Sequence, residues 1–187
     1  MLLVSVRKFI LPFLIFNVLI WSYSTPGFGQ QYSVEPTIKA GDEVPKPAEA
    51  VVLTVSGDIG ASNTDNGLQF DMETLEALGM VELEVTDPWA EEKRAYSGVL
   101  LSDLLDVVKV AEQVKYILAT AGDGYLAPVP VEQIRAIPII LATRLNGQHF
   151  LDSKEGPTRI IFPYDDVEDI KSARQMSVWN VVAIKTQ

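Results

Sequence analysis

The sequence contains no cysteine, which excludes disulfide bonds, thiolate metal ligands, cysteine nucleophiles and a lipoprotein anchor. Histidine occurs once, at His149, so a zinc or iron site built from several histidines is not expected. Basic residues are also few, with 15 Lys and Arg against 25 Asp and Glu and a formal net charge of -10. Because nucleic-acid phosphates bind to basic surfaces, this balance argues against a nucleic-acid partner.

Residues 1–29 have the pattern of an export signal. Two basic residues precede an almost wholly apolar run at 9–21, and Gly27 and Gly29 place small residues where a signal peptidase cleaves. The apolar run is shorter than the roughly 20 residues that span a bilayer as a helix. We therefore expect cleavage near Gln30, no stable membrane insertion afterwards, and a periplasmic or secreted protein. A retained N-terminal anchor is the alternative, because further apolar residues precede the basic pair.

The rest of the chain is expected to form an arm and one domain. Residues 30–50 contain three prolines and little periodicity, which indicates an arm that leads into the domain and stays outside its core. Residues 51–187 have the usual length of a single domain. Asp71 is expected to cap a helix that ends at Gly79, and Asn146-Gly147 predicts a two-residue hairpin turn.

The hydrophobic pattern predicts many strands and few helices. Apolar or alternating runs of strand length occupy 51–55, 80–86, 115–120, 125–129, 139–144, 158–162 and 179–185, and a short strand or turn occupies 96–99. Short helices are expected at 72–78, 102–108 and 130–135, and a solvated loop at 164–176. Regular alternation of strands and helices is missing, so the pattern predicts an α+β fold with a mixed β-sheet.

Five segments carry a family resemblance when they are taken in order. They are 85–89 (VTDPW), 96–105 (YSGVLLSDLL), 121–125 (AGDGY), 141–147 (LATRLNG) and 156–163 (GPTRIIFP), and a closing Ser177-Val178-Trp179 follows. This succession resembles the molybdopterin-binding domain of the sulfite oxidase fold from about residue 51 to the end. The resemblance implies a cleft for a pterin, and it places Ser177 and Trp179 on a segment that contacts the pterin.

The sequence departs from that family at the metal. Catalytic members hold molybdenum through a cysteine placed soon after the strand at 81–86, a position that falls near Asp87. A carboxylate is not equivalent to this soft thiolate, so molybdenum is not expected. A short, exported, cysteine-free domain resembles the periplasmic pterin-binding proteins that regulate cyclic-di-GMP enzymes. The resemblance implies a reduced pterin of monapterin or neopterin type as ligand, and the periplasmic domain of a membrane-bound cyclic-di-GMP cyclase or phosphodiesterase as partner.

A pterin is a flat bicycle with hydrogen-bond donors on one edge, so it needs an aromatic or cationic plane and a carboxylate. The residues expected to bind it are Trp89, Trp179, Asp87, Asp123, Arg174, Ser177 and Tyr125. Several of them have an ordinary structural explanation as well. Trp179 begins an apolar strand and suits a core, Asp87 and Asp123 suit turns, and Arg174 suits the surface.

Two other functions stay open beside non-catalytic pterin binding. One is a molybdopterin-dependent oxidoreductase, and the other is an exported interaction module in which the cleft is a relic. Outside the expected site, Arg144 interrupts an apolar strand and is expected to pair with a loop carboxylate. His149 follows the predicted hairpin turn and is expected to be a surface residue.

Overall fold

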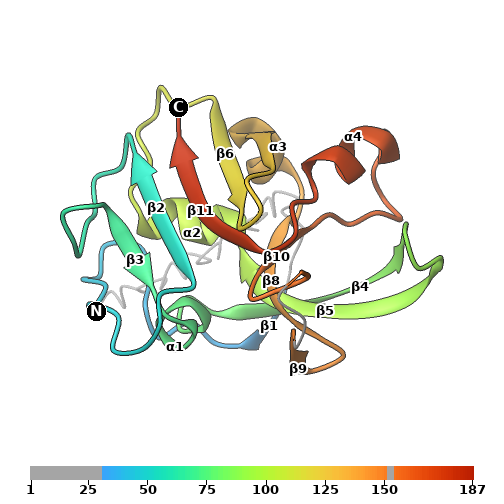
Figure 1. Ribbon diagram of the computed structural model, residues 1–187, viewed down its shortest axis with the longest axis horizontal. Helices are drawn as coiled ribbons and strands as arrows, with labels where there is room; N and C mark the ends of the chain where they lie inside the picture. Colours follow the sequence, from blue (N-terminus) through green and yellow to red (C-terminus); the bar gives the residue numbers. More distant parts are fainter. Residues whose placement is uncertain (1–30, 151–153) are drawn as a thin grey trace, which may run out of the picture.

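The computed structural model describes residues 31–150 and 154–187 (Figure 1). The expected export signal at 1–29 lies outside these residues. Within the described part, no helix has the length and apolar character needed to cross a membrane. The strands form two sheets, and the four described helices are short.

The first sheet is antiparallel throughout. Its strands are ordered β1 (Tyr32–Val34), β4 (Met80–Asp87), β5 (Glu92–Leu100), β8 (Ile140–Leu145) and β10 (Arg159–Ile161), with β9 (Gln148–His149) paired to β8. Figure 1 shows β4 and β5 as a long ribbon that extends beyond the rest of the sheet. The turn at the end of this ribbon carries Trp89.

The second sheet is mixed. Its strands are ordered β3 (Leu68–Phe70), β2 (Leu53–Gly57), β11 (Val181–Thr186), β6 (Tyr116–Ala121) and β7 (Leu126–Pro130). Strand β11 runs parallel to β2 and antiparallel to β6. The predicted α+β class is confirmed, with the strands divided between two sheets. The second sheet is mixed because β11 pairs between β2 and β6, two strands from earlier in the chain.

Four helices accompany the sheets: α1 (Met72–Glu76), α2 (Leu101–Val107), α3 (Val131–Ala136) and α4 (Ile170–Met176). The predicted loop at 164–176 was therefore wrong in its second half. Asp169 caps α4, since its Oδ1 accepts a hydrogen bond from the Ser172 N–H at 3.0 Å and its Oδ2 accepts one from the Ser172 hydroxyl at 2.6 Å. The helix was missed because it buries Ala173 alone and so shows almost no apolar periodicity.

The segment 31–50 also packs more closely than an arm outside the core. Strand β1 pairs with β4, and the Tyr32 hydroxyl donates a hydrogen bond to Asp103 at 2.6 Å. Val44 is only 5% exposed and belongs to the hydrophobic core. These contacts come from single residues spaced irregularly along the segment, which is why no periodic pattern announced them.

Local backbone signals were more reliable. Gly79 has φ +92°, as expected of a glycine that ends a helix. Asn146 and Gly147 both have positive φ, at 51° and 77°, and join β8 to β9 as the predicted two-residue hairpin. One hydrophobic cluster contains residues from both sheets and all four helices, so the described residues share a single core.

Asp71 stabilises the N-terminus of α1. Its carboxylate accepts hydrogen bonds from the Thr74 N–H at 2.9 Å and from the Ala48 and Glu49 N–H groups at 2.8 and 3.1 Å. It therefore caps the helix and fastens the preceding segment at once. We expect Asp71→Ala to lower the free energy of unfolding by about 1–2 kcal/mol at pH 7.

The same substitution has a predictable pH dependence. Hydrogen bonds from Thr74 lower the pKa of Asp71 from 3.8 to about 2. Because the folded-state pKa lies below the unfolded value, the stabilisation is complete above that unfolded value and is lost as the pH falls toward 2. Urea unfolding at pH 7 and pH 3 should show the difference between wild type and Asp71→Ala shrinking with acidity. A difference that stays constant would contradict this assignment.

Candidate functional site

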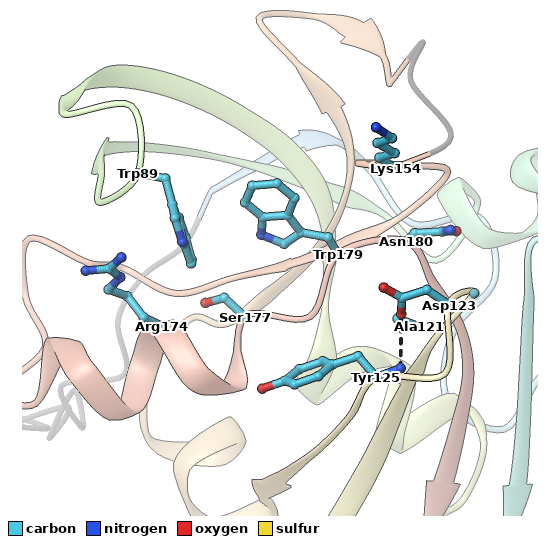
Figure 2. A pocket seen from close by; sticks show the side chains of 10 residues that line it. Trp89, Ala121, Asp123, Tyr125, Lys154, Arg174, Ser177, Trp179 and Asn180 are labelled. Carbon is cyan, nitrogen blue, oxygen red and sulfur yellow. Dashed lines mark hydrogen bonds between the residues drawn. The ribbon is translucent and has the colours of Figure 1, made fainter.

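A cavity of about 730 Å³ lies where the β4–β5 turn, the β6–β7 turn and the α4–β11 segment meet (Figure 2). The structure brings six of the seven expected residues to its wall: Trp89, Asp123, Tyr125, Arg174, Ser177 and Trp179. These residues come from three separate parts of the sequence. Its volume lies within the range of about 300–1,000 Å³ that is usual for small-molecule sites.

Two tryptophans form the aromatic part of the wall. The ring centroids of Trp89 and Trp179 are 5.4 Å apart with an interplanar angle of 75°, and Trp89 meets Tyr164 edge-on at 6.0 Å. Trp89 is 37% exposed, so much of its indole is free of the core. Because the two indoles lie edge to face, a planar ligand stacked on one of them meets the edge of the other.

Asp123 has the structural role that was considered for it, and it also lies at the cavity wall. Its Oδ1 accepts a hydrogen bond from the Tyr125 N–H at 3.0 Å, which stabilises the turn between β6 and β7 (Figure 2). The following Gly124 has φ +90°, as this tight turn requires. Among the described residues none donates a hydrogen bond to Oδ2, so this oxygen remains an acceptor at the cavity wall.

The hydroxyl groups of the wall are already bonded to the protein. Ser177 is buried, and its Oγ donates to the Ala173 carbonyl at 2.7 Å and lies 2.7 Å from the Tyr164 hydroxyl. Burial raises the pKa of Tyr164 to about 12, so this phenol stays neutral. The Tyr125 hydroxyl donates to the Gln175 carbonyl at 2.8 Å. These bonds connect α4 and the residue that follows it to neighbouring parts of the cavity wall.

Arg174 supplies an accessible positive charge. It lies in the last turn of α4, and its Cζ is 5.3 Å from the centre of the Trp89 ring. No ion pair joins Arg174 to a carboxylate within 31–150 and 154–187. The aromatic contact positions the guanidinium while leaving its N–H groups available to a carbonyl or an anion.

Asp87 does not reach the cavity, which corrects its expected role in binding. It is 1% exposed and accepts hydrogen bonds from the Trp89 and Ala90 N–H groups at 2.9 and 2.8 Å and from the Tyr96 hydroxyl at 2.6 Å. Burial alone would raise the pKa of Asp87, but the hydrogen bonds from Tyr96, Ala90 and Trp89 lower it. Asp87 therefore stabilises the turn that presents Trp89.

Sequence reasoning missed Arg159, a charge near the cavity that is as deeply buried as Asp87. Its side chain is 1% exposed, and its Cζ lies 3.9 Å from the centre of the Trp179 ring and 5.0 Å from that of Trp89. Its Nη2 is 3.4 Å from Asp87, and its Nε has no hydrogen-bond partner among residues 31–150 and 154–187. An arginine inside the apolar run 158–162 was the available signal, because a charge in a buried strand needs a specific reason.

Away from the cavity, Arg144 makes the kind of ion pair that was expected of it. Its Nε and Nη2 contact the two oxygens of Glu76 at 3.0 and 2.6 Å. The partner is a helix residue and not the predicted loop carboxylate. His149 also contacts Glu76 at 2.9 Å, although its side chain stays 46% exposed.

The residues at the cavity fit a pterin ring better than a molybdenum centre. Two indoles, one guanidinium and one carboxylate oxygen match the face and the edges of the ring. The thiolate that would tie molybdenum to the protein is missing from the sequence, and the lone pairs of Asp87 are occupied by internal donors. Among the described residues, no group of three or more His, Asp or Glu side chains is arranged to hold a metal ion.

Comparison with known proteins agrees with the fold. The model of the oxidoreductase molybdopterin binding domain matches residues 44–178. Among solved structures, the sulfane dehydrogenase SoxCD from Paracoccus pantotrophus superposes with a TM-score of 0.56 at 17% identity. That match covers 90% of this chain and 54% of the other, so this chain spans about half the length of its structural neighbour. Identity at this level shows the fold alone.

A search of curated proteins found no significant match. The family match nevertheless extends over most of the sequence and includes five of the six expected residues at the cavity wall, while Trp179 follows directly after its end. The chain therefore belongs to the family of oxidoreductase molybdopterin-binding domains.

Proposed function

We propose that this protein binds a free reduced pterin and catalyses no reaction itself. The observation that carries the proposal is the cavity wall, where two indoles, an exposed guanidinium and a carboxylate oxygen surround one space. Each group matches one part of a pterin. The ring face stacks on an indole, the donor edge meets Asp123 Oδ2, and the ring carbonyl accepts from Arg174.

The surroundings of Asp87 support binding without catalysis. By the resemblance, the position of the metal ligand in catalytic relatives falls near this residue. Here three donors and a guanidinium surround its carboxylate, and its side chain is almost fully buried. A ligand for a metal ion needs lone pairs directed at an open position, whereas these point into the protein. The Asp87 carboxylate therefore has a structural role.

We also propose a cellular location and a protein partner for this chain. The pattern of residues 1–29 supports export to the periplasm or beyond. The resemblance to exported, cysteine-free pterin-binding regulators supports a ligand of monapterin or neopterin type. It also supports, as partner, the periplasmic domain of a membrane-bound cyclic-di-GMP cyclase or phosphodiesterase. Co-purification with such a domain, in the presence and absence of a reduced pterin, tests this part separately.

The family itself favours one second candidate, a molybdopterin-dependent oxidoreductase. A molybdopterin would present its pterin ring to the same indoles, guanidinium and carboxylate. Its metal would then need a ligand from outside the described residues. Metal analysis of the protein purified from its native host distinguishes the two functions, since stoichiometric molybdenum would contradict the binding proposal.

Calorimetric titration with a tetrahydropterin under anaerobic conditions tests the proposal. Stacking contributes about 0.5–1.5 kcal/mol and a charged hydrogen bond about 1.5–3 kcal/mol. We therefore expect the Trp89→Ala, Asp123→Ala double variant to bind roughly 30- to 2,000-fold more weakly. Tyr116→Ala is the matched control, because Tyr116 is an exposed aromatic residue outside the cavity wall. Absence of binding or thermal shift at millimolar pterin would contradict the proposal and favour an interaction module with a relic cleft.

A further inference from the structure

We propose that Arg159 makes the cavity selective for an electron-rich, reduced pterin ring over its oxidised form. This inference rests on the proposed function and names the property of the ligand that the site distinguishes. Arg159 would act through Trp179 as a specificity-determining residue, without touching the ligand. Its place behind the cavity wall, its loose ion pair and its contact with the indole carry the inference.

Arg159 lies behind the part of the cavity wall that Trp179 forms. Arg159 belongs to β10 and is buried, whereas Trp89 and Trp179 both line the cavity. The guanidinium lies 3.9 Å from the centre of the Trp179 ring, which is close stacking contact. One face of this indole is therefore covered by a cation. Since Trp179 is only partly buried and lines the cavity, its remaining surface is what a ligand meets.

The ion pair between Arg159 and Asp87 is long. Arg159 approaches Asp87 at 3.4 Å and the Tyr96 hydroxyl at 3.5 Å, and within the described part of the chain its Nε has no hydrogen-bond partner. Strong guanidinium–carboxylate pairs are bidentate and about 2.7–2.9 Å long. Arg144 makes such a pair with Glu76 in the same chain, with one contact of 2.6 Å. The Arg159 side chain is thus arranged for the ring and only loosely for the carboxylate.

The Asp87 carboxylate has hydrogen-bond donors other than Arg159. Asp87 already accepts hydrogen bonds from the Trp89 and Ala90 N–H groups and from the Tyr96 hydroxyl, all at 2.9 Å or less. These donors compensate part of its negative charge. The guanidinium, which lies against the Trp179 ring, is therefore only partly neutralised by Asp87. In a buried environment such a charge is only weakly screened.

A cation against one face of an indole draws π-electron density toward itself. The opposite face then becomes less negative and stacks more favourably on an electron-rich ring. A tetrahydropterin carries an electron-rich aminopyrimidinone, whereas the fully oxidised pterin is an electron-poor bicycle. The same cavity should therefore hold the reduced form more tightly, which would make occupancy a measure of the ligand's redox state.

The experiment compares two dissociation constants in the full-length protein. A tetrahydropterin and its fully oxidised counterpart are titrated anaerobically into wild type, Arg159→Met and Arg159→Lys. We expect wild type to bind the reduced form about tenfold more tightly, as a cation–π effect of this kind implies. Arg159→Met should bring the two constants close together, and Arg159→Lys should restore most of the preference because it keeps the charge.

A merely structural role gives a different result, because Arg159→Met would then weaken both forms equally and leave their ratio unchanged. That outcome overturns the inference, and so does a wild type that binds both forms equally. If Arg159→Met does not fold, Asp87→Asn with Arg159→Met replaces it, since this pair leaves no unbalanced buried charge. Binding of neither form by wild type overturns the proposed function as well, so the two failures are distinguishable.

Discussion

Asp87→Ala is expected to lower the free energy of unfolding by about 3–5 kcal/mol, because it leaves the guanidinium of Arg159 buried without a counter-charge. Asp87 and Arg159 are each 1% exposed, so water cannot replace the lost carboxylate without opening the structure. The substitution also removes the acceptor for the Trp89 and Ala90 N–H groups and for the Tyr96 hydroxyl. Urea unfolding followed by tryptophan fluorescence measures the loss.

A double variant separates the unbalanced charge from the other losses. Asp87→Ala combined with Arg159→Met removes both charges, and we expect it to be more stable than Asp87→Ala alone. Far-ultraviolet circular dichroism of each variant checks that the fold is retained. A loss below about 1 kcal/mol in Asp87→Ala would mean that Arg159 finds solvent, which the burial of this residue contradicts.

Gly98→Ala is expected to lower the free energy of unfolding by about 3 kcal/mol or more, since overpacking at backbone atoms cannot relax by rotating a side chain. Gly98 lies in β5 opposite Ala142 of β8, at an irregularity in the register. A Cβ at this position would lie 2.2 Å from the Leu141 carbonyl oxygen and 2.4 Å from the Ala142 Cα. The two strands would have to separate at the centre of the first sheet.

The neighbouring residue provides the control for this prediction. Ser97 lies in the same strand and is also buried, and Ser97→Ala introduces no backbone clash. We expect Ser97→Ala to change the free energy of unfolding by less than about 1 kcal/mol. Chemical denaturation of both variants gives the comparison. Equal losses in the two variants would show that the close approach of β5 and β8 is not the cause.

The sequence was most informative where local chemistry decides the outcome. Asp71 caps α1 and Asn146-Gly147 forms a hairpin because capping and positive φ depend on a few consecutive residues. The residues at the ends of strands, such as Trp89 and Asp123, were recognisable as site candidates for the same reason. Helix α4 and strand β1 were not, because each contributes too little apolar surface to leave a periodic pattern.

The role of each charged residue required the tertiary structure. Asp87 and Asp123 look alike in sequence, since each lies in a turn at the end of a strand. One is buried against Arg159, 72 residues away along the chain, while the other lies at the cavity wall. Burial and pairing of this kind depend on contacts between distant segments, which no window of sequence contains.

By itself, the sequence determined the type of chemistry that is possible here: without a cysteine there is no thiolate for molybdenum, and the tryptophans and aspartates after strand ends provide planes and acceptors for a ring. Only the tertiary structure decided which of these groups face one cavity. It also placed Arg159 behind Trp179, because three strand ends and one short helix must first meet before a cavity exists.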